Sequence, residues 1–214
     1  MAEKGNTREM ILETALELFS IRGYEATSVS QIVDAVGIRK ASMYSHFKSK
    51  QEILDELVRV GLEKYNERSI FSQANWDDPN FTRDKQNITP DDVLKMILKQ
   101  VEYIIHDPQI SKMRKLLTVE QFQNPKLKEL QTKQNYTDVL HFFTGLVRFL
   151  VRLGKLEGKD EEIMAAQLCL PISVWINLCD REPEREEEVM RLIERHVRRF
   201  FGLYSADIGE GDPA

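Results

Sequence analysis

The sequence lacks the patterns that most enzymes and membrane proteins carry. No uninterrupted apolar run approaches the ~18 residues that a membrane-spanning helix needs. The amino-terminal residues do not show the pattern of a signal peptide, which is a basic start followed by an apolar run and a small-residue cleavage site. The sequence also has no glycine-rich phosphate loop and no nucleophile elbow. We therefore expect a soluble, cytoplasmic protein that is not an enzyme and needs no cofactor.

Cysteine is also scarce, because the chain has only Cys169 and Cys179. Both lie in one apolar region. Intracellular proteins rarely keep disulfides, and an unpaired cysteine behaves as a small apolar side chain. We predict two buried, reduced thiols, with a disulfide or redox pair as the alternative.

Metal-binding patterns are limited to two acid and histidine pairs on predicted helices. Glu102 precedes His106 by four residues, and Asp138 precedes His141 by three. Either pair could supply two ligands, but neither has the second paired motif of a carboxylate-bridged site. We interpret both pairs as solvated helix faces and predict no metal site.

The balance of charge excludes a protein that coats nucleic acid through bulk electrostatics, because the formal net charge is -5 and the pI is near 5.5. One stretch differs from the rest of the chain. No acidic residue lies between Asp34 and Glu52, although basic residues are frequent there. Any binding to phosphate is therefore expected to be local. The basic residues of this stretch are Arg39, Lys40, Lys48 and Lys50.

The same stretch has the pattern of two short helices joined by a turn. Ser28 and Gln31 form a capping box ahead of an apolar set at helical spacing. Gly37 ends this first helix, since glycine reaches left-handed backbone angles without a steric penalty. In the second helix Met43 and Phe47 lie four residues apart and share the inward face. The pattern predicts a helix-turn-helix, although glycine turns of this kind are common in helical proteins.

The residues of this stretch resemble the amino-terminal signature of the TetR family of transcriptional regulators, over roughly residues 7 to 55. One position departs from that signature: the residue after Ile38 is often a capping serine in the family and is Arg39 here. Arginine cannot accept a hydrogen bond, so either the second helix starts uncapped or Ser42 and the backbone compensate. The residues that carry the resemblance are Thr27, Ser28, Ile32, Val36, Gly37, Ile38, Met43, Tyr44, His46, Phe47 and Lys50.

The resemblance implies an all-α fold with a three-helix helix-turn-helix head joined to a larger helical body for ligand binding and dimerisation. The rest of the chain agrees, because it has apolar stripes at helical spacing and no alternating strand pattern. We predict a DNA-binding domain over 1–48, an effector-binding and dimerisation domain over 49–205 and a disordered tail over 206–214. The polar segment 72–88 shows no periodicity, and its structure is left open.

A helix laid in the major groove presents its early residues to base edges, which makes Arg39, Lys40 and Ser42 candidate base readers. By resemblance, Tyr44, His46 and Lys50 match positions that often contact phosphate. For Tyr44 and His46 the alternative is a ring packed between helices. Lys50 in the first turn of a helix opposes the helix dipole, so we expect a phosphate nearby. The predicted DNA-binding residues are Ser28, Ser30, Arg39, Lys40, Ser42, Tyr44, Ser45, His46, Lys48 and Lys50.

For the body, the resemblance implies a homodimer formed by the last two helices, which presents two reading heads to a pseudo-palindromic operator in double-stranded DNA. It also implies a pocket for an unknown small effector that releases a repressor from DNA. A helical adaptor that binds protein alone is the alternative function. The predicted ligand-binding residues, for which plain core is the alternative, are Tyr65, Met96, Tyr103, Phe122, Tyr136, Phe142 and Trp175.

Overall fold

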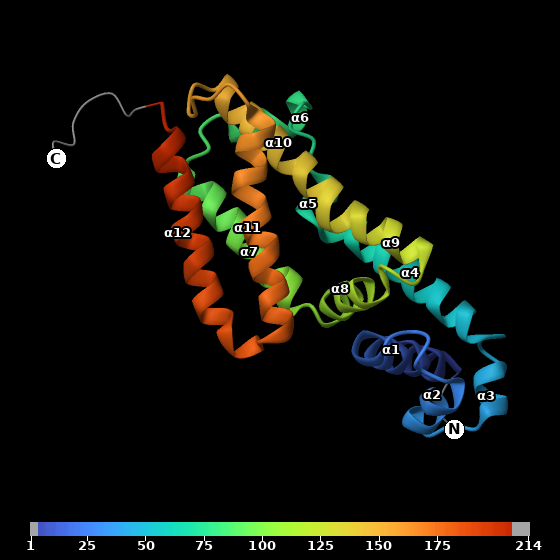
Figure 1. Ribbon diagram of the computed structural model, residues 1–214. Helices are drawn as coiled ribbons and strands as arrows, with labels where there is room; N and C mark the ends of the chain where they lie inside the picture. Colours follow the sequence, from blue (N-terminus) through green and yellow to red (C-terminus); the bar gives the residue numbers. More distant parts are fainter. Residues whose placement is uncertain (1–3, 207–214) are drawn as a thin grey trace. The chain divides into compact units, whose positions relative to one another are not determined.

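The computed structural model describes residues 4–206, and these residues form helices with no strand among them. The chain divides into two compact units (Figure 1). The amino-terminal unit holds the chain up to Arg68 together with His106–Thr132, and the carboxy-terminal unit holds Ser69–Ile105 and the chain from Lys133. The predicted all-α class is confirmed. The predicted tail from 206 to 214 lies outside the described residues except for Ala206.

The amino-terminal unit is larger than the predicted three-helix head, because a long helix and two later helices pack onto it. Its core joins α1 to the short helices through residues such as Phe19, Ile32 and Met43 and includes Leu116 from α8 and Leu127 from α9. The predicted functional boundary at residue 48 stays a prediction. The helices of this unit are α1 (Lys4–Arg22), α2 (Val29–Val36), α3 (Lys40–Tyr44), α4 (Lys50–Arg68), α8 (Pro108–Glu120) and α9 (Pro125–Thr132).

The carboxy-terminal unit is built on three long helices, in which α11 packs against both α10 and α12. Asp160 caps α11 through the Ile163 amide, and a Thr89 and Asp92 capping box begins α7. A π-helical turn over Lys133–Thr137 lies between α9 and α10 in the chain. The elements are α5 (Ile70–Gln73), α6 (Pro79–Thr82), η1 (Arg83–Lys85), α7 (Pro90–His106), η2 (Lys133–Thr137), α10 (Asp138–Arg152), α11 (Glu161–Arg181), η3 (Pro183–Arg185) and α12 (Glu186–Tyr204).

The segment 72–88, which sequence periodicity left open, is organised around Trp76. This side chain is only 3% exposed, and its ring centroid lies 5.2 Å from that of Phe81 and 5.6 Å from that of Phe142. Gly145 in α10 makes room for it, because a Cβ at that position would lie 2.8 Å from the Trp76 ring. The segment therefore consists of short helices that a single buried aromatic residue fixes to the core.

Helix α11 is an apolar helix of 21 residues, although no uninterrupted apolar run within it reaches the length of a membrane span. By length and composition alone it could cross a membrane. It is also a core helix: Leu168 and Ile172 are buried in the unit, and core helices commonly pass the same test. The thiols of Cys169 and Cys179 are both buried, as predicted, and burial raises the pKa of Cys169 to about 11.

Candidate nucleic-acid interface

The first helix of the predicted helix-turn-helix, α2, has the termini that the sequence indicated. The Gln31 amide donates to Ser28 Oγ at 3.2 Å, and the Ser28 amide donates to Gln31 Oε1 at 2.7 Å, which completes the capping box. Gly37 follows at φ 76°, in the left-handed region, and its amide bonds back to the Val33 and Asp34 carbonyls. Both predictions about α2 are confirmed.

The second helix, α3, has no side-chain cap. Arg39 occupies the cap position in an extended conformation, and the Ser42 amide instead donates to the Arg39 carbonyl at 2.9 Å. Met43 is fully buried and Phe47 is 1% exposed, so the inward face is the predicted one. These two anchors leave the remaining side chains of α3 on its outer faces.

The structure brings most of the predicted DNA-binding residues together on exposed positions of α2, α3 and the turn after α3. Tyr44 is 49% exposed, so its ring is not packed between helices, whereas His46 is half-buried. Ser45 Oγ donates to the Ser42 carbonyl at 2.7 Å and is therefore already partly engaged. Seven residues of the set are exposed: Ser28, Ser30, Arg39, Lys40, Tyr44, Ser45 and Lys48; Ser42, His46 and Lys50 are intermediate.

Lys50 has partners within the protein. Its ammonium donates to the backbone carbonyls of Tyr24, at 2.7 Å, and Thr27, at 3.0 Å, and it lies 4.0 Å from the centroid of the Tyr24 ring. The two carbonyls belong to the turn that leads into α2. The two carbonyl oxygens therefore explain how the first turn of α4 tolerates the positive charge of Lys50 without a phosphate. A phosphate contact by Lys50 stays a prediction.

Glu120 at the end of α8 also holds this turn, and no pattern in the sequence indicated it. Its carboxylate accepts a hydrogen bond of 2.7 Å from the Tyr24 amide, and the side chain is 4% exposed. Gly23 precedes Tyr24 at φ 85°, and a Cβ there would lie 2.8 Å from Glu120 Oε1. The left-handed glycine is thus required both for the turn and for the approach of the carboxylate.

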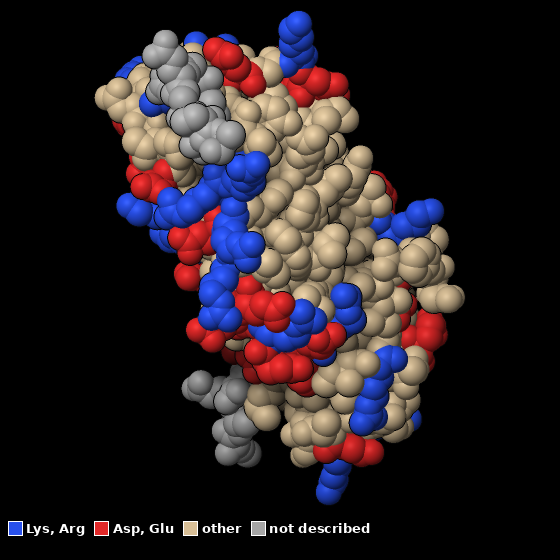
Figure 2. All heavy atoms as spheres, turned by 60° about the vertical axis from the view of Figure 1, so that its left-hand side comes forward, with Lys and Arg blue, Asp and Glu red and all other residues tan. Residues whose placement is uncertain are grey.

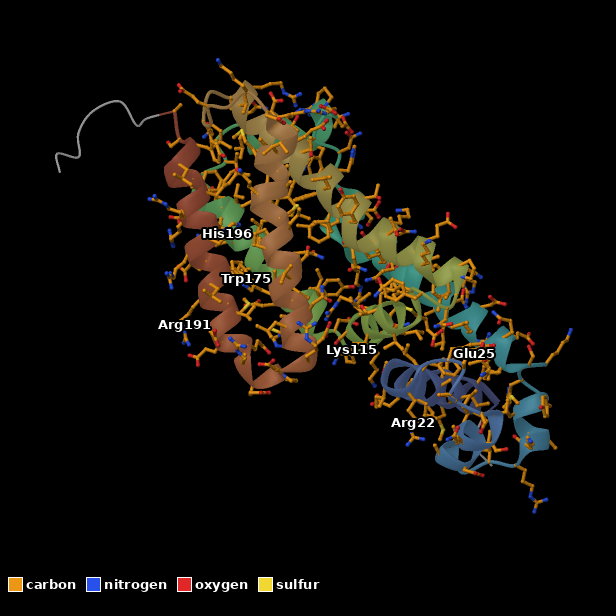
Figure 3. All side chains as sticks on the ribbon, viewed as in Figure 1. Arg22, Glu25, Lys115, Trp175, Arg191 and His196 are labelled. Atoms are coloured by element: carbon orange, nitrogen blue, oxygen red, sulfur yellow. The ribbon has the colours of Figure 1, made fainter. Side chains whose placement is uncertain are left out.

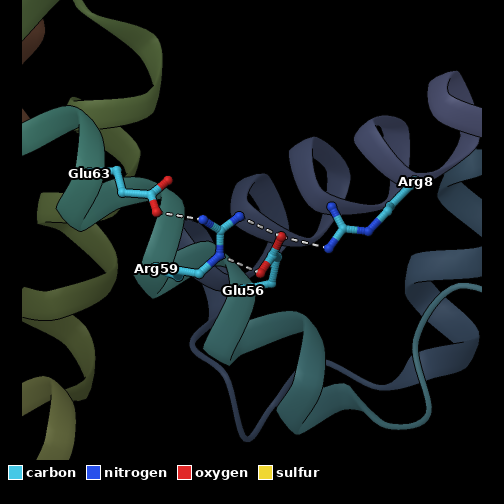
Figure 4. A network of polar contacts seen from close by, with 4 residues as sticks. All are labelled: Arg8, Glu56, Arg59 and Glu63. Atoms are coloured by element: carbon cyan, nitrogen blue, oxygen red, sulfur yellow. Dashed lines mark hydrogen bonds and ion pairs between the residues drawn. The ribbon is translucent and has the colours of Figure 1, made fainter.

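A chain of charged side chains joins α1 to α4 (Figure 4). Glu56 accepts hydrogen bonds from Arg59, at 2.8 and 2.9 Å, and from Arg8, at 2.6 Å, while Arg59 also donates to Glu63 at 2.5 Å. The hydrogen bonds from Arg59, followed by those from Arg8, lower the pKa of Glu56 to about 2. This network ties the first helix of the unit to the long helix that follows α3.

The predicted ligand-binding residues are divided between the two units, and their role stays a prediction. Tyr65 and Phe122 belong to the amino-terminal unit, and the other five belong to the carboxy-terminal unit. Phe142 is 1% exposed and makes edge contacts with Phe71 and Trp76, as a core residue does. Phe122 is 85% exposed, Tyr136 is 53% exposed, and Tyr65 is buried. Met96, Tyr103 and Trp175 are partly buried.

Trp175 on α11 and His196 on α12 meet inside the carboxy-terminal unit (Figure 3). Their ring centroids lie 5.4 Å apart in an edge arrangement, and His196 Nε2 lies 3.0 Å from the Leu168 carbonyl oxygen. The described residues contain no group of three or more His, Cys, Asp and Glu side chains that could hold a metal ion.

Comparisons with known proteins agree with this geometry. Residues 11–57 match the family model for bacterial regulatory proteins of the tetR family. The HTH-type transcriptional repressor KstR2 of Rhodococcus jostii is 43% identical over 68 residues, which cover 30% of this chain and 33% of that protein. The biofilm operon regulator IcaR of Staphylococcus aureus is 35% identical over 66 residues, 31% of this chain and 36% of IcaR. The chain thus spans about a third of the length of the curated relatives it matches.

Solved structures extend the likeness in fold to nearly the whole chain. SmeT, the repressor of the Stenotrophomonas maltophilia multidrug efflux pump SmeDEF, superposes with a TM-score of 0.59 at 22% identity, covering 96% of this chain and 97% of SmeT. A SmeT–triclosan complex gives the same TM-score at 23% identity, with 98% and 100% covered. At this identity the comparison shows the fold alone.

Glu56 predicts a pH dependence of stability. Its folded-state pKa is below the ordinary value of 4.5, so its contribution to the free energy of unfolding is complete above about pH 5 and is lost as the pH falls toward 2. Glu56→Gln is expected to lower the free energy of unfolding at pH 7 by about 1 to 2 kcal/mol, after allowance for solvent screening of its arginine partners. The variant is also expected to show a weaker dependence of the free energy of unfolding on pH between about pH 5 and pH 2. Urea unfolding between pH 2 and pH 7 measures both effects.

The matched control is Glu63→Gln, which removes a carboxylate from the same network, but this carboxylate is 57% exposed and pairs with Arg59 alone among the described residues. It is expected to change stability by less than about 0.5 kcal/mol. Equal losses for the two variants, or a Glu56→Gln curve parallel to the wild-type curve, would contradict the assignment.

Proposed function

We propose that this chain, which belongs to the TetR family of bacterial regulatory proteins, is a cytoplasmic DNA-binding transcriptional repressor that is released from its operator by a small effector. The observation that carries the proposal is the arrangement of α3. Met43 and Phe47 anchor it in the core, while Arg39, Lys40 and Tyr44 are exposed beside it with no acidic residue nearby in the sequence. The names of the matching relatives, a repressor and a negative regulator, favour repression.

In this proposal α3 enters the major groove and the surrounding residues contact phosphate. Lys40 is the first residue of α3, where a side chain reaches base edges, and its ammonium makes no ion pair within the described residues. Lys48 follows α3, and its backbone amide donates a hydrogen bond to Glu52, while its ammonium has no ion pair within the part of the chain that the structure describes. We therefore assign base reading to Lys40 and a phosphate contact to Lys48.

Titration of duplex DNA tests these roles. Lys40→Ala is expected to cost about 1 to 3 kcal/mol on duplex from the region flanking the gene of this protein and to cost much less on a random duplex of equal length. Lys48→Ala is expected to weaken binding to both duplexes and to lower the slope of log affinity against log salt by about one. Fluorescence anisotropy at two salt concentrations measures both.

Equal losses for Lys40→Ala on the two duplexes would remove its assignment as a base reader. Absence of any preference of the wild-type protein for the flanking region over random DNA, at every salt concentration, would count against this region as the operator. Absence of DNA binding altogether would contradict the proposed function.

We further propose that the protein acts as a homodimer whose interface includes α11. Ile163, Leu170 and Val174 are 54%, 40% and 62% exposed, and their spacing of seven and four residues puts them on one face of that helix. Figure 2 brings the α12 side of the molecule forward, where an area without charged side chains lies beside a band of Lys and Arg. An exposed apolar stripe of this kind is typical of a surface that a second copy covers.

Val174→Glu tests the dimer. In a two-fold interface the variant places one new carboxylate from each copy in an apolar surface, where the two like charges have no basic partner. We therefore expect the affinity of the dimer to fall about a hundredfold, or about 3 kcal/mol. Sedimentation velocity over a concentration series measures the change. Ile21→Glu, at a 67% exposed position on α1, makes the same chemical change in the other unit and is expected to leave the dimer intact. A monomeric wild-type protein at micromolar concentration would overturn the proposal.

The effector proposal draws support from two buried donors in the carboxy-terminal unit. Trp76 Nε1 and Gln100 Nε2 have no hydrogen-bond partner within the described residues, and their side chains belong to residues that are 3% and 5% exposed. A buried donor without an acceptor is costly, and a ligand that supplies an acceptor oxygen removes that cost. We therefore propose an apolar effector that carries a hydrogen-bond acceptor. The fold relative SmeT forms a complex with triclosan.

A thermal-shift screen of apolar compounds with and without acceptor oxygens tests this proposal. A true effector is expected to raise the Tm of the protein and to weaken its binding to DNA. Gln100→Met keeps the length of the side chain but removes the donor, together with the oxygen that accepts the long Ile70 amide hydrogen bond of 3.4 Å, and it is expected to weaken effector binding about tenfold. Gln123→Met, at an exposed position of the other unit, is the matched control. An unchanged effector affinity in Gln100→Met would exclude Gln100 as its partner.

A further inference from the structure

A cleft of about 540 Å³ opens in the amino-terminal unit between α1, α4 and α8. This volume lies within the usual range for small-molecule sites, roughly 300 to 1,000 Å³. No residue predicted to bind DNA or effector lines it. Its floor is apolar and is formed by Leu12 and Leu16 of α1, Leu57 and Val60 of α4, and Pro108 of α8.

The charges around the cleft are not balanced. Its two lysines are neutralised from within the protein, since Lys64 contacts Asp107 at 2.7 Å and Lys112 contacts Glu17. The two acids of the cleft, Glu9 and Glu13, lie one turn apart on α1, and both are exposed.

Neither Glu9 nor Glu13 forms an ion pair within the described residues. Two uncompensated carboxylates therefore stand beside an apolar floor, and the local field favours a positive charge. An anion would meet the carboxylates as like charges, and an uncharged apolar molecule would gain no electrostatic attraction from them.

We propose that this cleft binds an organic cation, with an apolar body against Leu12, Leu16, Leu57 and Val60 and an ammonium group beside Glu9 and Glu13. The site is distinct from the proposed effector site, because its residues belong to another unit. An occupant contacts α1, α4 and α8 at once, so binding stabilises the packing of the helices that hold α2 and α3.

Three fluorescent probes with one fluorophore test the proposal on the full-length protein. Dansylcadaverine carries an ammonium group at the end of a short alkyl tether. Its N-acetyl derivative has a neutral amide in place of the ammonium group, and dansyl-6-aminohexanoic acid has a carboxylate at the end of its tether. The emission of the dansyl group reports its transfer to an apolar site. We expect the ammonium probe to bind about fivefold more tightly than the neutral probe, which corresponds to a partly exposed ion pair, and the carboxylate probe to bind most weakly.

The double variant Glu9→Gln/Glu13→Gln removes both charges while keeping the shape of the cleft, and it is expected to abolish the preference for the ammonium probe. Glu25→Gln/Glu129→Gln is the matched control, because it removes two exposed carboxylates of the same unit that do not line the cleft. The preference of this control variant for the ammonium probe over the neutral probe is expected to equal that of the wild-type protein. Gln109→Trp, which fills the cleft, is expected to weaken all three probes alike.

A preference for the ammonium probe that persists in Glu9→Gln/Glu13→Gln would overturn the proposal, as would equal binding of the three probes to the wild-type protein. Unchanged binding in Gln109→Trp would place the probes elsewhere and would also overturn it. None of these outcomes depends on DNA binding, so failure of this inference and failure of the proposed regulatory function are distinguishable.

Discussion

The turn between α1 and α2 is held by a buried carboxylate and a lysine that come from distant parts of the chain. Glu120 accepts the Tyr24 amide, and Lys50 donates to the Tyr24 and Thr27 carbonyls. A charge-assisted hydrogen bond in a buried position is stronger than a neutral one and is costly to break. Since this turn sets where α2 begins, the position of the exposed residues of α3 depends on it. Interface residues of this kind are useful only if the supporting contacts are rigid.

The same contacts connect the proposed reading surface to α8. Glu120 lies at the end of α8, and α8 packs on α1 through Leu116 and Leu117. A change in the position of α8 would therefore reach Tyr24 both through the buried hydrogen bond to Glu120 and through this packing. The cleft between α1, α4 and α8 lies beside this packing, so a ligand there would favour one arrangement of the three helices over another.

The carboxy-terminal unit combines a well-packed aromatic core with two features that a packed core does not need. Trp76, Phe142 and Phe149 pack closely, and Gly145 admits the indole ring. Yet Trp76 Nε1 and Gln100 Nε2 are buried donors without partners in the described part of the chain. Ile163 and Val174 meanwhile expose apolar surface along α11. Buried donors and exposed apolar stripes both carry a cost in an isolated chain, and a ligand and a second copy would remove the two costs respectively.

Local sequence patterns correctly predicted the all-α class, the capping box of Ser28 and Gln31, the left-handed Gly37 and the inward pair Met43 and Phe47. These features depend on atoms within about four residues of one another, so local pattern is sufficient to predict them. The three-dimensional packing of the chain was needed to identify the partners of Lys50, since the carbonyls it contacts lie 23 and 26 residues earlier in the chain. It also decided the role of Glu120, which bonds an amide 96 residues away, and the folding of segment 72–88 around Trp76. Contacts of this kind arise from packing between elements, and no periodicity along the chain records which side chains will meet.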